Sequence, residues 1–144
     1  MNELAQVSEI MATNLVVVSP YEDLTVVDRI FSDQKIHHLP VVDKFELVGM
    51  VSKSDYLKFA FGLSRVSGKI EHVDENLLKG VEVSEIMTTG IAKLSPEDRI
   101  ATAAQIFKEN LFHAIPIVEN KKLVGIVTTF DLINFCFQIP SLSA

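Results

Sequence analysis

The sequence is poor in the residues that support disulfide, thiolate-metal or redox chemistry. Its 144 residues include one cysteine, Cys136, and no tryptophan. A single cysteine cannot form an intrachain disulfide, and it excludes metal sites built on several thiolates. The four histidines show neither the HxxxH nor the HExxH spacing that is typical of zinc sites. We therefore expect no metal site and no required cofactor.

Basic residues and long apolar stretches are also scarce. Lysine and arginine number 13 against 19 acidic residues, which gives a formal charge of −6. Such a chain lacks the basic surface that nucleic-acid binding requires. No apolar run approaches the roughly 20 residues of a membrane span, and the first ten residues lack the basic and apolar regions of a signal peptide. We expect no nucleic-acid partner, no membrane insertion and a cytoplasmic location.

The motifs of common catalytic sites are missing. The sequence contains no Gly-x-Ser-x-Gly, no Walker A motif, no GxGxxG and no cysteine–histidine pair at a recognisable spacing. We expect no catalytic residues and predict that the chain is not an enzyme.

What the sequence does contain is an internal repeat. Residues 7–59 align without a gap on residues 83–135, at a shift of 76 positions, and 19 of these 53 pairs are identical. The stretch LVGMVSKSD at 47–55 returns as LVGIVTTFD at 123–131, and VSEIM at 7–11 returns at 83–87. A match of this length indicates a duplication. It predicts repeats at 7–63 and 83–140, joined by a connector at 64–82.

Each repeat predicts the same order of elements, strand, helix, strand, strand, helix, and hence an α/β (α+β) fold. The β-branched run at 15–18 predicts a buried strand, as does its copy at 91–94. Ser19-Pro20 and Ser95-Pro96 carry helix-start signals, a capping serine followed by proline. Two strands follow in each copy, at 39–42 and 47–51 and at 115–118 and 123–127, with polar turns between them.

The last helix of each repeat, predicted at 53–63 and 129–139, is apolar nearly all round. Asp131, Asn134 and Gln138 form one narrow polar stripe in the second of them. Such a helix needs burial on more than one side. We predict a homodimer through these two helices; in the alternative, the chain is a monomer whose two repeats cover both sides.

Two Ser/Thr-x-x-Asp steps, Ser52 to Asp55 and Thr128 to Asp131, stand where a strand runs into a helix. One interpretation is structural, because a hydroxyl at the N-cap and an acid at the third helical position form a capping box. The other is functional, because a helix N-terminus suits a phosphate and a carboxylate there can accept the hydroxyls of a ribose. The two interpretations are compatible.

Nearby polar residues and glycines fit the same alternatives. His37, His38 and His113 precede the Pro-containing strands, where they interact with a helix end, stay solvated or donate to a phosphate. Lys53 can donate to a phosphate from the first helical turn. Gly49 and Gly125 lack side chains, so a ligand or a neighbouring backbone can come close to the strand.

These motifs together resemble a tandem pair of CBS domains, a Bateman module, over nearly the whole chain. The resemblance rests on VSEIM-x-T, on the Ser-Pro step, on His-x-x-Pro, and on the Gly-x-Val-[Ser/Thr]-x-x-Asp step in both copies. It implies two β-α-β-β-α repeats related by a pseudo-twofold axis, with the sheets packed on each other and the helices outside. It also implies homodimers and clefts for adenine-containing ligands such as AMP, ADP, ATP, S-adenosylmethionine or cyclic di-AMP.

The resemblance also implies roles for individual residues. Asp55 and Asp131 would bind ribose hydroxyls, and Ser52 and Thr128 ribose or phosphate. The adenine base would be lined, largely by backbone, by Thr13, Leu15, Val16, Thr89, Ile91 and Ala92. His37, His38 and His113 match positions that touch phosphates in the gamma subunit of AMP-activated protein kinase, where an arginine often follows the histidine. Here His38 and Ala114 stand at that place, which puts a triphosphate in doubt at one cleft.

Two functions follow from these observations. The first is a regulatory module that binds an adenine nucleotide and signals through its dimer to an unknown protein. The second is a purely structural dimerisation or interaction module that retains the Ser/Thr-x-x-Asp step as a helix cap.

Overall fold

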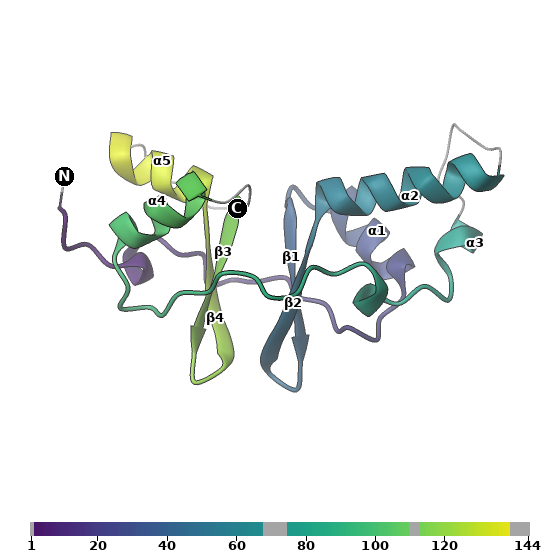
Figure 1. Ribbon diagram of the computed structural model, residues 1–144, viewed down its shortest axis with the longest axis horizontal. Coiled ribbons are helices and arrows are strands. Elements are labelled where there is room, and N and C mark those ends of the chain that lie inside the picture. The colour runs from purple at the N-terminus through teal and green to yellow at the C-terminus, as the bar shows by residue number, and fades with distance from the viewer. Residues whose placement is uncertain (1, 68–74, 110–112, 139–144) are drawn as a thin grey trace. The chain divides into compact units, whose positions relative to one another are not determined.

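The computed structural model describes residues 2–67, 75–109 and 113–138, without the side chains of 63–67 (Figure 1). Its elements in chain order are the 3-10 helix η1 (Val7–Glu9), α1 (Leu24–Asp33), β1 (His38–Asp43), β2 (Glu46–Ser52), α2 (Lys53–Ser67), α3 (Glu75–Leu78), the 3-10 helix η2 (Val83–Glu85), α4 (Ile100–Glu109), β3 (Ala114–Glu119), β4 (Lys122–Thr128) and α5 (Thr129–Phe137). The mixed α/β fold class predicted from the sequence is confirmed. No described helix has both the length and the apolar character needed to cross a membrane.

The chain forms two compact units that divide it differently from the sequence repeats. Unit 1 comprises Met1–Leu15 and Ile91–Ala144, and unit 2 comprises Val16–Gly90. Each unit therefore holds the hairpin of one repeat and the VSEIM segment of the other. The middle of the predicted connector, residues 68–74, and the predicted end at 139–140 lie outside the described residues.

The exchange of the VSEIM segments is visible in the backbone hydrogen bonds. In unit 2, the amide of Val83 donates to the carbonyl of Glu22 at 2.9 Å. In unit 1, the amide of Val7 donates to the carbonyl of Asp98 at 2.8 Å. Both valines are fully buried, each in the core of the unit that it joins. Their burial anchors the exchanged segments through the hydrophobic effect.

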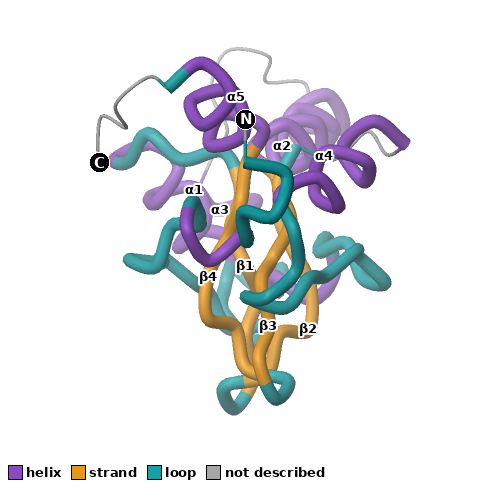
Figure 2. The backbone as a smooth tube through the Cα atoms, turned by 90° about the vertical axis from the view of Figure 1, so that its left-hand side faces the viewer, coloured by secondary structure: helices purple, strands orange, loops and turns teal. Residues whose placement is uncertain are grey.

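Each unit is built around a β-hairpin. In unit 2, β1 pairs antiparallel with β2, and His38 lies opposite Ser52. In unit 1, β3 pairs with β4, and Ala114 lies opposite Thr128. Each turn lies at the opposite end of its strands from the helix that follows the hairpin (Figure 2). Because the Ser/Thr-x-x-Asp step follows the second strand, it lies at the helix end of its hairpin.

Both hairpin turns are tight and use left-handed backbone. Lys44 and Phe45 have φ angles of 49° and 72°, and Asn120 and Lys121 have φ angles of 52° and 66°. Two successive residues with positive φ match the twist of the flanking strands. Asparagine adopts this conformation readily, whereas a bulky residue such as Phe45 does so at a cost.

Each unit has its own apolar core. The core of unit 2 lies between its hairpin and helices α1, α2 and α3, and contains Val18, Leu24, Val27, Phe31, Leu39, Val41, Val51, Tyr56, Ala60, Leu78 and Val83. The core of unit 1 contains Ala5, Val7, Leu94, Ile100, Ala103, Ile115, Ile117 and Val127.

The predicted helix starts at the two Ser-Pro steps were wrong. The first helix begins at Leu24, and its N-cap is Asp23, whose side chain accepts from the amide of Thr25. Ser19 instead begins a turn in which its amide donates to Glu22 and its hydroxyl accepts from the amide of Tyr21. In the second repeat the helix begins at Ile100, and the amide of Ser95 donates to Asp98. A Ser-Pro step with an acid two or three residues later is satisfied by a closed turn as well as by a helix.

The predicted strands at 15–18 and 91–94 are reduced to single bridges. Val18 forms a parallel bridge with Val41, and Leu94 forms one with Ile117. Val17 is 43% exposed, so this stretch is not buried throughout. A β-branched run predicts extended backbone, but the run forms a strand only where a neighbour pairs along its length.

The two glycines of the second strands are explained by a neighbouring segment of the same unit. A Cβ atom on Gly49 would lie 2.7 Å from the Sδ of Met87 and 3.0 Å from the carbonyl oxygen of Thr88. A Cβ atom on Gly125 would lie 2.5 Å from the Sδ of Met11. Of the two alternatives left by the sequence, the structure shows the close approach of a neighbouring segment. The exchanged VSEIM methionines therefore pack directly on these glycines.

Candidate functional site

The candidate site residues gather at two equivalent places, each at the start of a hairpin-following helix. We call the first the Ser52 corner, defined as His37, His38, Ser52, Lys53 and Asp55 of unit 2. We call the second the Thr128 corner, defined as His113, Thr128 and Asp131 of unit 1. Each corner lies within a single unit.

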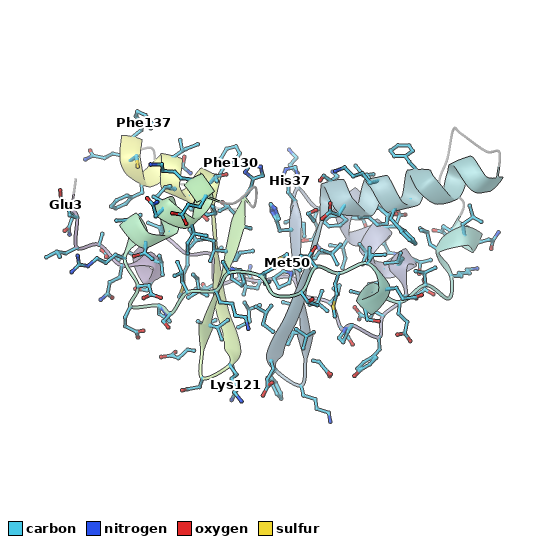
Figure 3. The ribbon with its side chains drawn as sticks, in the orientation of Figure 1. Glu3, His37, Met50, Lys121, Phe130 and Phe137 are labelled. Atoms are coloured by element: carbon cyan, nitrogen blue, oxygen red, sulfur yellow. The ribbon has the colours of Figure 1, made fainter. Side chains whose placement is uncertain are left out.

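Backbone hydrogen bonds hold each corner together. The amide of Lys53 donates to the carbonyl of His37 at 2.8 Å. The amide of Thr129 donates in the same way to the carbonyl of His113 at 3.0 Å. The histidine that precedes the first strand is thus fixed beside the first turn of the helix that follows the second. His37 is exposed and projects beside the start of α2 (Figure 3).

The Thr128 corner forms a complete capping box. The amide of Asp131 donates to the Oγ1 of Thr128 at 3.3 Å. In return, the Oδ2 of Asp131 accepts from the amide of Thr128 at 2.8 Å and from its hydroxyl at 3.0 Å. Both side chains are half-buried. One oxygen of this carboxylate is therefore engaged in helix capping.

The Ser52 corner is capped from one side. The amide of Asp55 donates to the Oγ of Ser52 at 3.1 Å. The side chain of Asp55 is exposed, and within the described part of the chain no hydrogen bond reaches its carboxylate. The two corners share residue types, but they differ in the engagement of the carboxylate.

The residues expected to line a base divide between the units. Val16 belongs to unit 2, with the Ser52 corner, and Ile91 and Ala92 belong to unit 1, with the Thr128 corner. The parallel bridge of Val18 with Val41 brings Val16 alongside the start of β1, near the Ser52 corner. The bridge of Leu94 with Ile117 brings Ala92 alongside the start of β3 in the same way.

The other three expected base-lining residues belong to the opposite unit from the corner of their own repeat. Thr13 and Leu15 lie in unit 1, and Thr89 lies in unit 2. Thr13 and Thr89 are exposed, and Leu15 is half-buried. Their role at a base stays a prediction.

Among the described residues, no three histidine, cysteine, aspartate or glutamate side chains lie together as a metal site.

One acidic residue that the sequence analysis overlooked, Asp23, has a structural role. Asp23 caps α1 and also accepts from the amide of Gly80 at 2.7 Å. These two backbone hydrogen bonds, from Thr25 first and then from Gly80, hold the pKa of Asp23 below its usual value. Its position directly before the apolar Leu24 was the signal that could have identified it.

Comparison with known proteins places the chain in a family. Residues 7–62 and 83–137 each match the family model of the CBS domain. The chain belongs to the CBS domain family. A CBS pair is a regulatory module rather than an enzyme. This agrees with the prediction that the chain is not an enzyme.

Relatives of the CBS pair differ in length. The pair is 30% identical to protein MJ1426 of Methanocaldococcus jannaschii, over 92% of this chain and 91% of that protein. It is also 30% identical to protein MJ1404 of the same organism, over 90% of this chain but 31% of that protein. A third relative, MJ1225, is matched over 46% of its length. The chain thus spans about a third of one of these longer relatives and about half of the other.

Solved structures share the fold. The crystal structure of CBSX2 in complex with AMP, a CBS-pair protein of Arabidopsis thaliana, superposes on this CBS pair with a TM-score of 0.77. The two are 26% identical, and the match covers 95% of this chain and 99% of CBSX2.

Proposed function

We propose that this CBS pair is a regulatory sensor that binds an adenine nucleotide of the AMP class and passes the signal through a homodimer to another protein. The observation that carries the proposal is the pairing of a hydroxyl with a carboxylate at the start of both α2 and α5. Support comes from CBSX2, which is 26% identical and whose structure contains AMP.

The Ser52 corner offers the groups that a nucleoside monophosphate needs. The Asp55 carboxylate is exposed and can accept both hydroxyls of a ribose, each through a charge-assisted hydrogen bond. The half-buried Lys53 and the exposed His37 can donate to a phosphate at the N-terminal end of α2. Val16, half-buried beside the start of β1, supplies apolar surface for a base.

The Thr128 corner is expected to bind the same ligand more weakly. The Oδ2 of Asp131 already accepts two hydrogen bonds, so a ribose must compete with the capping box. Thr129 stands where the first corner has Lys53, and Ala114 stands where it has His38. This corner therefore offers less positive charge to a phosphate. For the same reason we expect AMP to be preferred to ATP.

The corners are connected to the surfaces through which we expect the dimer to form. Asp55 and Asp131 lie in the first turns of α2 and α5. The same two helices expose large apolar side chains: Leu57 (37%), Phe61 (53%), Phe130 (74%), Ile133 (49%) and Phe137 (74%). Phe130 and Phe137 project outward from α5 (Figure 3). A ligand that orders the first turn of either helix would thereby act on the proposed dimer contact.

The second candidate function, a structural module without nucleotide, is favoured by the closed capping box at Thr128. There the hydroxyl and the carboxylate satisfy each other and the backbone of α5. On this reading Ser52 and Asp55 would be a looser form of the same cap.

The deciding experiment measures binding by calorimetry and by thermal shift. The ligands are AMP, ADP, ATP, S-adenosylmethionine and cyclic di-AMP, with GMP as the control. A ligand at about a hundred times its dissociation constant adds roughly 2.7 kcal/mol of stability, a shift of several degrees for a domain of this size. The expected result is binding of AMP with a preference over GMP.

Two matched variants separate the proposals. Asp55→Asn should weaken AMP binding by about tenfold or more, since it removes a charge-assisted acceptor, and it should leave the stability of the free protein nearly unchanged. Asp131→Asn should lower the stability by about 1 kcal/mol through the lost cap. The sensor is rejected if no adenine ligand shifts the melting temperature, or if the Asp55 variant binds AMP as well as the parent.

A further inference from the structure

The β1–β2 turn and the loop before α1 each carry an exposed aromatic side chain that the second repeat lacks. Phe45 is 76% exposed at the second turn position, and Tyr21 is 67% exposed in the loop before α1. The hydroxyl of Tyr21 donates to the Oδ2 of Asp43 at 3.0 Å, and Asp43 closes the turn opposite Glu46. This hydrogen bond ties Tyr21 to the turn that carries Phe45. We call Tyr21, Asp43, Phe45, Glu46 and Glu82 the hairpin patch.

The second repeat serves as an internal comparison for this patch. At a shift of 76, Tyr21 becomes Glu97, Phe45 becomes Lys121 and Glu46 becomes Lys122. Both turns have the same left-handed backbone, so the turn geometry does not require an aromatic residue. Lys121 also projects at the tip of its hairpin (Figure 3). Residues held in a costly backbone conformation cluster at functional surfaces, which makes the exposed Phe45 a candidate contact residue.

The surroundings of the aromatic residues are acidic. Asp43 and Glu46 flank the turn, and the segment that carries Glu82 lies beside the Tyr21 loop, since the amide of Ser84 donates to the carbonyl of Pro20. Hydrogen bonding to Asp43 raises the pKa of Tyr21, and the charge of Glu82 adds to this to a smaller extent. Lys44 is the one basic residue of the turn. Negative charge of this kind opposes phosphate groups of nucleic acids and anionic lipids.

We propose that the hairpin patch docks a positively charged protein segment in which arginine is combined with apolar residues. Guanidinium groups stack on the exposed faces of Tyr21 and Phe45, and they pair with the carboxylates of Asp43 and Glu46. The Glu82 carboxylate already accepts from the backbone of η2 and from the Ser84 hydroxyl, so it adds negative charge to the patch. Aromatic residues in such patches commonly carry much of the binding energy of an interface.

The patch is separate from the nucleotide corner of the same unit. Strand β2 runs from Glu46 at the turn to Ser52 at the corner. Six steps of about 3.3 Å place the two ends roughly 20 Å apart. The docking of a partner segment at the hairpin therefore does not depend on the identity of the nucleotide, and the two proposals can fail independently.

The test uses the full chain and a short capped peptide in which arginine alternates with leucine. Binding is followed by calorimetry and by NMR shifts of Tyr21, Phe45 and their neighbours. The expected result is a set of shifts confined to the hairpin patch, with weaker binding of the lysine–leucine peptide and none of the glutamate–leucine peptide. Equal binding of the two cationic peptides, or shifts spread over other surfaces, would overturn the proposal.

Variants keep the test independent of folding. Phe45→Gly removes the aromatic ring and also relieves the left-handed backbone, so it should weaken peptide binding about tenfold while raising the melting temperature. The graft Tyr21→Glu, Phe45→Lys and Glu46→Lys, which copies the second repeat, should abolish binding. The control Lys121→Ala on the other hairpin should bind as the parent does. Unchanged affinity in the Phe45→Gly variant would also reject the proposal.

Discussion

The Tyr56 hydroxyl of α2 donates to the Oδ1 of Asp28 on α1 at 2.5 Å. Tyr56 is 2% exposed, and its ring also packs on Phe31 with the centroids 5.7 Å apart. The second repeat has Ala104 and Leu132 at the two matching positions, so both partners of the hydrogen bond are replaced together there. The first repeat thus joins its two helices by a polar contact, and the second lacks both partners of that contact.

This hydrogen bond predicts a specific loss of stability at alkaline pH. Burial first, and then the bond to Asp28, raise the pKa of Tyr56 far above its usual value of 10.0. Its contribution is fully present below the pKa of an unfolded tyrosine and is lost as the pH rises above it, because the unfolded state then releases the proton more readily. Tyr56→Phe should cost about 1 kcal/mol at neutral pH and should reduce the alkaline loss. Denaturant unfolding below and above pH 10 measures both; an equal alkaline loss in parent and variant would contradict the assignment.

The packing of Met87 on Gly49 predicts that added volume at this glycine destabilises unit 2. Gly49→Ala places a methyl group against a thioether and a backbone carbonyl. We expect a cost of about 1–3 kcal/mol, as for overpacking in a core. Gly62→Ala is the matched control: nothing lies within 4 Å of its Cβ position, and alanine favours the helix α2. The control should raise the melting temperature. If Gly62→Ala destabilised the protein, or if Gly49→Ala left its stability unchanged, the packing of Met87 on Gly49 would not explain the cost of added volume there.

The cap of α1 predicts that replacing Asp23 lowers the melting temperature more than replacing Ser19, and that the effect of replacing Asp23 depends on pH. Asp23→Ala should lower the melting temperature at neutral pH, because it removes the acceptor for the amides of Thr25 and Gly80. The pKa of Asp23 is lowered, so its contribution is present above the unfolded value near 3.8 and is lost as the pH falls through the folded pKa. The parent and the variant should therefore converge in acid. Ser19→Ala should lower the melting temperature less than Asp23→Ala does at neutral pH. If Ser19→Ala lowered it more, the N-cap of the first helix would be Ser19 and not Asp23.

The exposed apolar side chains of α5 predict that a charge there dissociates the proposed dimer. Phe130→Glu with Phe137→Glu should give a monomer at micromolar concentration, since burying an unpaired carboxylate costs several kcal/mol. Analytical ultracentrifugation measures the change. Phe45→Lys is the control, because Phe45 is 76% exposed but lies at a hairpin turn. A parent protein that is already monomeric would refute the homodimer.

The amino-acid sequence by itself determined the duplication, the two hairpins and the candidate corners. Strand pairs 39–42 with 47–51 and 115–118 with 123–127 lie inside the observed β1–β2 and β3–β4 hairpins. They were predictable because short apolar runs joined by a polar turn can pair locally. The caps at Ser52 and Thr128 were predictable for the same reason, since a capping contact spans three residues.

Contacts between segments distant in the sequence were decided by the tertiary structure alone. The first helix is capped by Asp23 rather than by Ser19, and Gly80, far along the chain, supports this cap by donating to the Asp23 carboxylate. The run at 15–18 forms a bridge at Val18 alone. A glycine is needed at position 49 because the Met87 side chain packs where a Cβ atom would lie. The exchange of the VSEIM segments between units cannot be read from a periodic sequence, because both copies present the same apolar residues. Which core each valine enters depends on where the connecting chain brings it.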